Sequence, residues 1–327
     1  MTGWAANIER RPPLARRVNE LYHDLRAGEF DRAHRFRYRI EREFWLREVV
    51  PHLGGEPFGL GVDLCTGTGF VPGLLLARLP RGGRVLCVDV SAASLRRAKR
   101  SLGALAERVD TCVADVQAIP LPDCSADWVT LNAGLHHLSR PGAVLAEVDR
   151  ILRPGGRFCL GYEPNARFFS SLVLFSLERA IWHAFWYLSP GRNLQRMQAL
   201  FRGSAPPGGA RRRAERINQI LMADGLIQRP LSARQIRDLV DIHARGQVGH
   251  DSRAGFLPRR LIQRHLPGYA VERMLFSDYG GEMLRRHPRL RGVVDGLLGC
   301  VCPGRGMLFS WIVRKPRAGT GSCGGSR

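Results

Sequence analysis

A glycine turn at residues 66–69, followed 20 residues later by an aspartate, constrains the fold of this sequence more than any other feature. Apolar residues 59–62 predict a short buried strand closed by Asp63, and Thr66-Gly67-Thr68-Gly69 leads into a predicted helix over Val71–Leu79. Glycine lacks a Cβ, so the backbone of such a turn can adopt positive φ and approach a ligand closely. A second predicted strand, residues 84–88, ends at Asp89. An acid in that place accepts hydrogen bonds from ribose hydroxyls, which indicates a nucleoside site.

The turn departs from the pattern that binds dinucleotides. That pattern, G-x-G-x-x-G, needs its third glycine for close packing of the helix on the strand. Pro72 occupies that position here, and Gly73 comes one residue late. The acid that precedes the turn, Asp63, is not part of the dinucleotide pattern either. The sequence therefore favours a different adenosine-containing cofactor.

The segment from Asp63 to Gly69 resembles the first motif of the class I S-adenosylmethionine-dependent methyltransferases, an acid followed by G-x-G-x-G. Cys65 stands where that motif has its first glycine. Further segments resemble the same family in order, over about residues 59–164: they are Val88–Ser91, Val113–Val116, a strand over Ala126–Asn132, the loop Ala133–Leu138, a helix over Val144–Leu152, the turn Arg153–Gly156 and a fifth strand over Arg157–Tyr162.

The resemblance implies S-adenosyl-L-methionine as the cofactor. It also implies an α/β fold, with a Rossmann-like, doubly wound, seven-stranded and mostly parallel sheet, a helical N-terminal segment and a helical insertion after strand five. Asp89 is expected on the ribose, and Asp115 and Val116 near the adenine. The complete set of expected cofactor-binding residues is Asp63, Cys65, Thr66, Gly67, Thr68, Gly69, Asp89, Val90, Asp115, Val116, Asn132 and Ala133.

The predicted elements divide the chain into five parts. These are an N-terminal helical cap (1–58), the S-adenosylmethionine-binding core (59–164), a helical substrate-lid insertion (165–267), the final sheet strands (268–316) and a disordered tail (317–327). In the cap, Tyr22 and Tyr38 are expected to pack in the core rather than reach the site. The insertion is predicted to contain an apolar helix over Phe168–Leu188, a loop rich in Gly and Pro over residues 203–209, and helices over residues 210–223 and 232–244, the last capped by Ser232. The final strands are predicted over residues 269–276 and 307–313, with a helix over residues 282–301 between them.

The charge of the chain is strongly basic and unevenly distributed. The net charge is +21, and residues 165–327 contain 27 basic and 10 acidic side chains. Such an excess attracts anionic lipid, RNA or an acidic substrate. The alternative is a general preference for arginine, because Lys99 and Lys315 are the only lysines.

Composition sets the expected compartment. No window of about 18 uncharged apolar residues indicates a membrane span, and no signal segment starts the sequence. The eight cysteines are scattered. Cys300 and Cys302 form a C-x-C motif, but no second pair of closely spaced cysteines accompanies it, as a zinc site would require. We expect a cytoplasmic protein without a metal site, with peripheral contact to an anionic membrane kept as an alternative.

Methyl transfer requires the acceptor atom, the methyl carbon and the sulfur to lie in line, and a hydroxyl or acidic carbon acceptor also requires a base. The candidates are His136 and His137 after strand four and Glu163 after strand five, where open α/β sheets place their ligands. The alternatives are that a histidine shapes the loop beside the cofactor, and that Glu163 bonds to loop backbone or to Asn165.

The sequence favours an S-adenosylmethionine-dependent methyltransferase that acts on a small hydrophobic acceptor, such as a lipid, a quinone or a secondary metabolite. The aromatic insertion is expected to form the acceptor pocket. The basic charge keeps an RNA methyltransferase open, although Asn132-Ala133-Gly134-Leu135 stands where enzymes that methylate exocyclic amines commonly carry Asn-Pro-Pro-Tyr. A protein acceptor, and a non-catalytic binding protein that uses the basic C-terminal region, also remain open, as does the oligomeric state.

Overall fold

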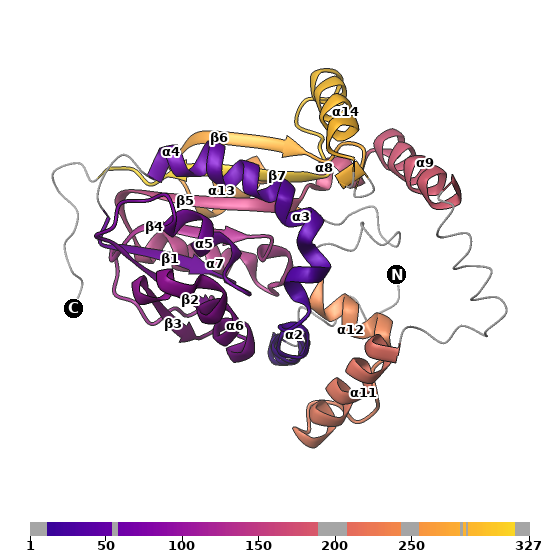
Figure 1. The fold of residues 1–327 in the computed structure, drawn as a ribbon, viewed down its shortest axis with the longest axis horizontal. Helices are drawn as coiled ribbons and strands as arrows, with labels where there is room; N and C mark the ends of the chain where they lie inside the picture. Colours follow the sequence, from indigo (N-terminus) through magenta and orange to yellow (C-terminus); the bar gives the residue numbers. More distant parts are fainter. Residues whose placement is uncertain are drawn as a thin grey trace. The chain divides into compact units, whose positions relative to one another are not determined.

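The computed structural model describes residues 12–53, 58–188, 208–242, 255–281, 284–285 and 287–317 (Figure 1). Contacts divide the chain into two compact units. The first, which we call the sheet unit, comprises His23–Glu163, Leu257–Leu275 and Phe309–Arg327; the second, which we call the helical unit, comprises Met1–Tyr22, Pro164–Phe256 and Phe276–Leu308.

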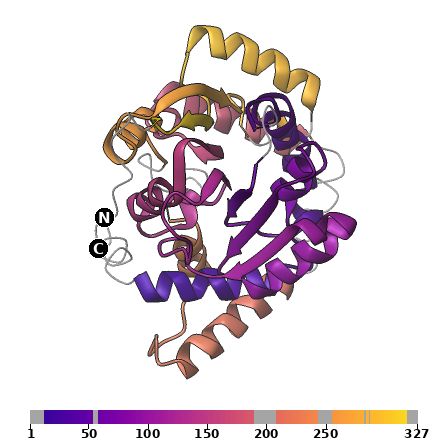
Figure 2. The same cartoon turned by 90° about the vertical axis from the view of Figure 1, so that its left-hand side faces the viewer.

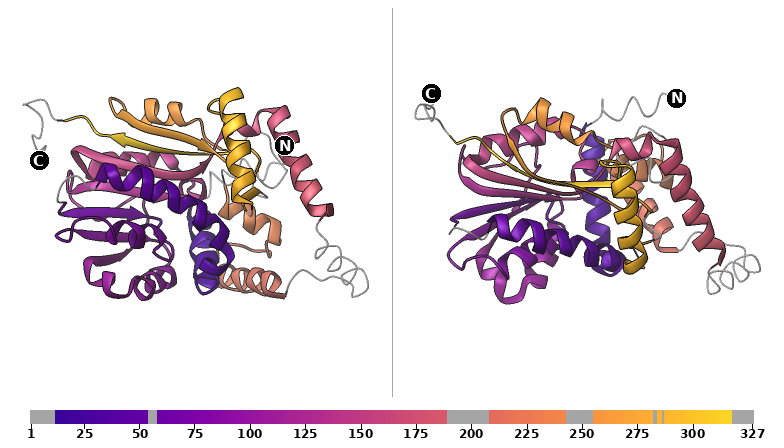
Figure 3. Two further views of the ribbon diagram at one scale, coloured as in Figure 1. Left: turned by 45° about the horizontal axis from the view of Figure 1, so that its top comes forward. Right: turned by 90° about the horizontal axis from the view of Figure 1, so that it is seen from above.

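A seven-stranded sheet with the order β3-β2-β1-β4-β5-β7-β6 forms the centre of the sheet unit. The pairs β1–β2, β2–β3, β1–β4 and β4–β5 are parallel. β7 runs antiparallel to β5, because the Lys315 N–H donates to the carbonyl of Gly156 while Ser310 lies against Tyr162. The strands fan out with the usual twist (Figure 3). The strands are β1 (Leu60–Leu64), β2 (Arg84–Asp89), β3 (Val109–Val113), β4 (Ala126–Asn132), β5 (Leu152–Pro164), β6 (Ala270–Ser277) and β7 (Leu308–Arg314).

Helices cover both faces of this sheet, as crossovers between parallel strands require. α5 packs with α6, and α7 packs with α13; Figure 2 shows the first pair and α7 on opposite sides of the strands. The helices of the sheet unit are α3 (Phe30–Phe44), the π-helix η1 (Trp45–Val49), α4 (Val50–Leu53), α5 (Phe70–Leu76), α6 (Ala92–Leu102), the 3₁₀ turns η2 (Gly103–Arg108) and η3 (Leu135–His137), α7 (Pro141–Ile151) and α13 (Pro258–His265). The predicted fold class is confirmed.

β5 is longer than predicted. Residues 153–156 were predicted as a turn, but they belong to the strand. The neighbouring strand β7 explains the difference, because the Gly155 N–H donates to the Lys315 carbonyl and the Gly156 carbonyl accepts from the Lys315 N–H. A local glycine pattern does not reveal a pairing partner that lies about 160 residues away in the sequence.

The helical unit carries five α-helices, α8 (Ala166–Phe169), α9 (Leu172–Leu188), α11 (Gly208–Ala223), α12 (Ala233–Val240) and α14 (Pro288–Val301), together with the first part of α2 (Pro12–Arg26), among the residues that the structure describes. The single helix predicted over Phe168–Leu188 is wrong, since Ser171 starts a new helix by accepting a hydrogen bond from the Leu174 N–H. Likewise, the helix predicted over residues 282–301 begins only at Pro288, whose fixed φ suits a first helical turn.

A compact apolar core joins α2, α11 and α12 in the helical unit. Its buried members are Leu14, Ala15, Val18, Leu21, Ile217, Leu221, Ile236, Leu239, Val240 and Ile242. Tyr22 packs against this core, as expected. Asn19 fastens α2 to α12 by donating to the Leu239 carbonyl at 3.1 Å. α12 ends at Val240 rather than at Ala244, and Ser232 caps it as predicted.

Two of the predicted features fall largely outside the described residues. These are the loop over residues 203–209, of which 203–207 are not described, and the tail, of which only Arg317 is. Within the described segments, none of the helices has both the length and the apolar composition that crossing a membrane requires.

Candidate cofactor and catalytic site

The turn between β1 and α5 has the backbone of a ligand-binding loop. Cys65, Gly67 and Gly69 have φ of 52°, 56° and 88°, a region that favours glycine. A Cβ on Gly69 would lie 3.0 Å from the Cβ of Ala98, so glycine lets α6 approach the turn. A Cβ on Gly67 would meet nothing within 4 Å. The turn therefore faces open space at Gly67.

Asp89 fastens this turn to the end of β2. Its Oδ2 accepts the Gly67 N–H and its Oδ1 accepts the Ser91 N–H, both at 2.8 Å. The side chain is buried, and burial raises its pKa above the ordinary value despite these two hydrogen bonds and the attraction of His137. The Ala114 N–H donates to the Asp89 carbonyl, which brings the loop after β3 beside the same site.

Asp63, near the end of β1, is a second buried carboxylate. Its Oδ1 accepts the Thr130 hydroxyl at 2.6 Å. Burial raises its pKa to about 7, and the neighbouring charge of Asp89 acts in the same direction. Two carboxylates held away from water in this way favour a cationic ligand, because positive charge offsets the cost of ionising them.

Helix α3 covers the glycine turn. The Tyr38 ring stacks on Phe70, with 4.1 Å between the ring centroids, and its hydroxyl lies 3.5 Å from the Thr68 hydroxyl. The Thr68 hydroxyl in turn donates to Asp31. Tyr38 therefore packs on the glycine turn, and the expectation that it lies in the core away from the site is wrong. Asp31, in the first turn of α3, is a partner of the glycine turn that the sequence did not single out.

The side-chain amide of Asn132, at the end of β4, forms hydrogen bonds with α3 and η1. Its Nδ2 donates to Glu41 at 2.7 Å, and its Oδ1 accepts the Trp45 indole N–H at 3.1 Å. Glu41 is fully buried and also pairs with Arg37. A charged pair four residues apart is a weak sequence signal, which usually marks an exposed helix face. Only the fold shows that Glu41 holds Asn132 in place.

The remaining predicted cofactor residues lie on the loops after β1, β2, β3 and β4. Asp115 accepts the Gln117 N–H at 3.0 Å, Val116 is buried and Val90 is half-buried. Ala133 has a φ of 49° and donates its N–H to the Gly161 carbonyl. Thr66 is buried and donates its hydroxyl to the Asp63 carbonyl. These loops all follow the carboxyl ends of the parallel strands.

Glu163 and His136 form a buried dyad. Glu163 accepts the backbone N–H groups of Gly134, Leu135 and His136, and the His136 Nδ1 lies 2.9 Å from its Oε2. Burial alone would raise the pKa of Glu163, but the attraction of His136 and these hydrogen bonds outweigh burial and lower it. Glu163 therefore stays ionised and bonds to loop backbone, which is the alternative considered for it from the sequence.

The dyad fixes the orientation of the His136 ring. An ionised carboxylate accepts the proton on Nδ1, which leaves Nε2 as the basic nitrogen of the neutral ring. The His137 ring lies 4.1 Å from that of His136 and meets His23 edge-on at 5.4 Å. His137 also lowers the pKa of Asp89 through its charge, although burial of Asp89 outweighs this effect.

The residues present fit S-adenosylmethionine. Its sulfonium and ammonium groups are cationic, as the buried pair Asp63 and Asp89 requires, and the open space at Gly67 leaves room beside the turn. The N–H groups of Gly67 and Ser91 hold the Asp89 carboxylate at the end of β2, where the resemblance to the methyltransferases leads us to expect the ribose hydroxyls.

Comparisons with known proteins agree with this fit. Residues 62–160 match a family described as "Methyltransferase domain". The ubiquinone/menaquinone biosynthesis C-methyltransferase UbiE of Acidiphilium cryptum is 36% identical over 149 residues, which are 45% of this chain and 59% of that protein. The demethylmenaquinone methyltransferase of Symbiobacterium thermophilum is 30% identical over 155 residues, 46% of this chain and 61% of that protein. The chain thus spans about three-fifths of the length of these relatives.

Solved structures with a similar arrangement include an S-adenosylmethionine-dependent methyltransferase from Mesorhizobium loti. It is 16% identical with a TM-score of 0.43, and the match covers 84% of this chain and 98% of that one. The [4+2]-cyclase SpnF has the same identity and TM-score, with 84% and 80% covered. At these scores neither structure defines the function.

Proposed function

We propose that residues 62–160, which match a methyltransferase domain, form a class I S-adenosylmethionine-dependent methyltransferase core. From this premise we propose that the protein methylates a carbon atom of a small hydrophobic acceptor such as a quinone. The pair of buried carboxylates at the glycine turn, Asp63 and Asp89, is the observation that carries the cofactor assignment. The names of the relatives support carbon as the methylated atom and a quinone as the acceptor. They do not favour RNA, or a non-catalytic role, over this activity.

When bound, the cofactor supplies a methyl carbon activated for direct displacement. The protein positions the acceptor in line with the methyl group and supplies a base. We assign the base to Nε2 of His136, which would accept the proton of a phenolic hydroxyl as the ring carbon is methylated. The hydrogen on that carbon then leaves as a proton and the oxygen is reprotonated, which restores the aromatic ring and its hydroxyl. Glu163 is a positioning residue in this scheme, since its carboxylate orients His136 and the loop from Gly134 to His136.

Binding of S-adenosylmethionine to the purified chain, measured by calorimetry, tests the cofactor assignment. Asp89→Ala is expected to weaken binding by about tenfold or more, because it removes both the ribose acceptor and the link to Gly67. Asp110→Ala is the matched control, since Asp110 is an exposed acid on β3 that pairs with Arg84. Unchanged affinity in the Asp89 variant contradicts the assignment.

Turnover of a demethylated quinol, followed by the gain of one methyl group in mass spectra, tests the activity and the base. His136→Gln is expected to lower kcat by about 10²–10⁴-fold, while cofactor affinity stays within about twofold. The decrease in kcat toward acidic pH, which protonation of the base causes in the parent, should disappear in this variant. Glu163→Gln should lower kcat less and keep the decrease toward acidic pH. Equal activity of the His136 variant and the parent rejects this base, and no transfer to any quinol rejects the proposed acceptor.

The insertion over residues 165–267 is our proposed source of acceptor specificity. It follows the segment that matches the family, which ends at residue 160, and it is rich in aromatic residues near its start. Exchange of this segment for that of a methyltransferase with another acceptor should change the acceptor used and leave cofactor affinity unchanged.

We also propose that the helical unit contacts an anionic membrane, where a quinone acceptor dissolves. α14 exposes an apolar stripe at helical spacing, formed by Leu290 (45% exposed), Val293 (59%), Leu297 (65%) and Val301 (75%). Leu172 and Val173 at the start of α9 are 80% and 77% exposed. Arginines flank the stripe at Arg289 and Arg305, which suits anionic headgroups.

Flotation with vesicles of phosphatidylcholine, with and without phosphatidylglycerol, tests this contact. Val293→Asp should reduce binding to the anionic vesicles by about tenfold, because it places a charge in the apolar stripe. Val113→Asp is the control, since Val113 is 60% exposed on β3 of the sheet unit. Equal binding by both variants, or no preference for anionic lipid, rejects the contact.

A further inference from the structure

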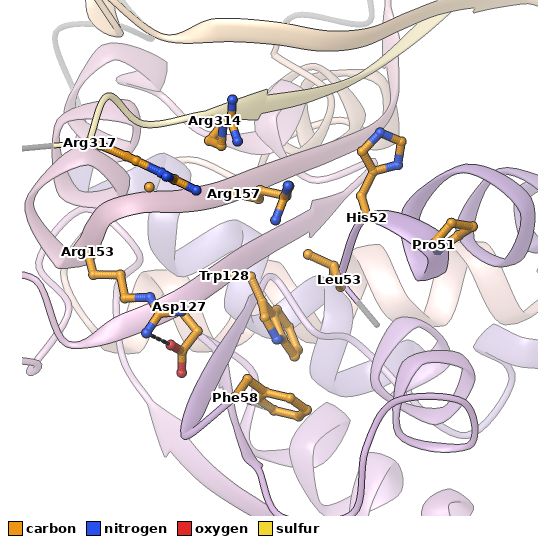
Figure 4. A pocket seen from close by; sticks show the side chains of 11 residues that line it. Pro51, His52, Leu53, Phe58, Asp127, Trp128, Arg153, Arg157, Arg314 and Arg317 are labelled. Carbon is orange, nitrogen blue, oxygen red and sulfur yellow. Dashed lines mark ion pairs between the residues drawn. The ribbon is translucent and has the colours of Figure 1, made fainter. Parts of the chain in front are cut away.

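A pocket of about 360 Å³ opens on the sheet unit, away from the glycine turn (Figure 4). Four of its lining side chains are guanidinium groups, from Arg153, Arg157, Arg314 and Arg317. The volume lies within the range of small-molecule sites. The catalytic scheme above does not use it.

Strand direction explains why these arginines meet. β4 and β5 begin at this edge of the sheet, where Asp127 and Arg153 are the second residues of their strands. β7 runs in the opposite direction, so its last residue, Arg314, reaches the same edge, and Arg317 follows it. The glycine turn and the loop after β4 follow the other ends of the parallel strands. The pocket therefore lies at the amino ends of the parallel strands, and the proposed cofactor site lies at their carboxyl ends.

The nearby carboxylates do not balance these arginines. Asp127 pairs with Arg153 at 2.6 Å and also accepts the N–H groups of Gly59 and Leu60. Glu272 pairs with both Arg157 and Arg314, at 2.7 and 3.2 Å. Two carboxylates thus serve four guanidinium groups, which leaves two positive charges uncompensated at the pocket among the described residues.

Trp128 adds an independent sign of a ligand. The side chain is 2% exposed and lines the pocket, and its indole N–H has no hydrogen-bond partner among the described residues. The indole is held firmly, since it covers Gly61, where a Cβ would lie 2.1 Å from its ring, and packs on Phe58. The N–H itself is closed off from solvent, so a ligand oxygen reaches it only when the side chains around it shift. A buried donor without an acceptor is costly, which favours such a shift.

The donors at this pocket select for an anion with several acceptor oxygens. Guanidinium groups and an indole N–H only donate hydrogen bonds, and the lining carboxylate, Asp127, is already satisfied. Arginine forks match the oxygens of phosphate in a bidentate manner. We propose that this pocket binds a phosphate monoester dianion, carried either by a soluble metabolite or by a lipid headgroup.

Calorimetric titration of the full chain with phenyl phosphate, without S-adenosylmethionine and at an ionic strength held constant with chloride, tests the proposal. We expect saturable binding of one equivalent. Arg317→Gln and Trp128→Phe should each weaken it by about fivefold or more. Arg317 is exposed, so its variant tests the site even if the Trp128 variant does not fold. Arg84→Gln is the matched control, because Arg84 begins β2 and pairs with Asp110 at 2.7 Å, as Arg153 pairs with Asp127.

Vesicles distinguish the two sources of the phosphate. Preference for phosphatidic acid over phosphatidylglycerol that is lost in Arg317→Gln assigns a lipid headgroup, and binding of phenyl phosphate without that preference assigns a soluble ligand. The proposal is overturned if phenyl phosphate shows no saturable binding, or if Arg84→Gln weakens binding as much as Arg317→Gln. Because no cofactor is present, these results are independent of whether the protein methylates a quinone.

Discussion

Cys65 shows what a single departure from a motif costs. It occupies the first glycine position of the turn and has a φ of 52°, a conformation that L-residues with a Cβ adopt at a cost of about 1 kcal/mol. Its side chain also leaves no room for a side chain at position 134 in the loop after β4, because a Cβ on Gly134 would lie 2.7 Å from the Cβ of Cys65. The cysteine and Gly134 therefore depend on each other.

A double-mutant cycle measures this dependence. Cys65→Gly should change the free energy of unfolding by no more than about 1 kcal/mol, since relief of strain is offset by greater freedom in the unfolded chain. Gly134→Ala alone should cost about 1–3 kcal/mol through overlap with Cys65, and less in the Cys65→Gly background. Urea denaturation gives all four values. Additive effects mean that the two residues do not interact in this way.

Asp63 makes the stability of the cofactor-free protein depend on pH. Its pKa is about 7 in the folded protein and 3.8 in a free side chain, so the folded state holds a proton that the unfolded state has lost. Stability should therefore fall as the pH rises from about 4 to about 7 and then level off.

Asp63→Asn tests this dependence, because asparagine keeps an oxygen for the Thr130 hydroxyl and never ionises. At pH 8 the variant should be more stable than the parent by on the order of 2–4 kcal/mol, and its affinity for the cationic cofactor should be lower. Denaturation curves from pH 5 to pH 8 give the difference. The same pH dependence in variant and parent contradicts the assignment to Asp63.

At the level of the elements, helix α12 illustrates a boundary that the sequence specifies locally. Ser232 accepts the Gln235 N–H at 3.2 Å, and the Gln235 side chain accepts the Ser232 N–H at 2.8 Å. Ser232→Ala removes the first of these bonds and should lower the free energy of unfolding by about 1 kcal/mol. Ser176→Ala, at an exposed position inside α9, is the control and should change it by less than about 0.5 kcal/mol. Equal effects would show that the cap does not contribute.

Other element boundaries depend on distant partners. The strand over Ala126–Asn132 has the bounds that the resemblance to the methyltransferase family implied. The start of β5 was missed, because β7 pairs with glycines that read as a turn. The break between α8 and α9 was missed as well, since apolar residues stand on both sides of Ser170 and Ser171 and hid this short polar interruption.

For the whole molecule, the proposed cofactor residues all lie in the sheet unit. S-adenosylmethionine at 100 times its Kd should stabilise that unit by about 2.7 kcal/mol. Hydrogen exchange should then slow at the most protected amides of β1, β2 and β4, with the amides of α11 and α12 measured as an internal reference. Slower exchange in α11 and α12 without any change in the sheet would place the cofactor elsewhere.

The sequence by itself determined the order of strands and helices, the family and the cofactor, because a glycine turn and an acid at two strand ends are local features. Tertiary structure alone decided how the charged groups are used. It buried Asp63, turned Glu163 into the partner of His136, and satisfied Asn132 with Glu41. It also gathered Arg153, Arg157, Arg314 and Arg317 at one edge of the sheet. Burial and pairing between distant residues set the energy of a charge, and neither quantity is written in the local sequence.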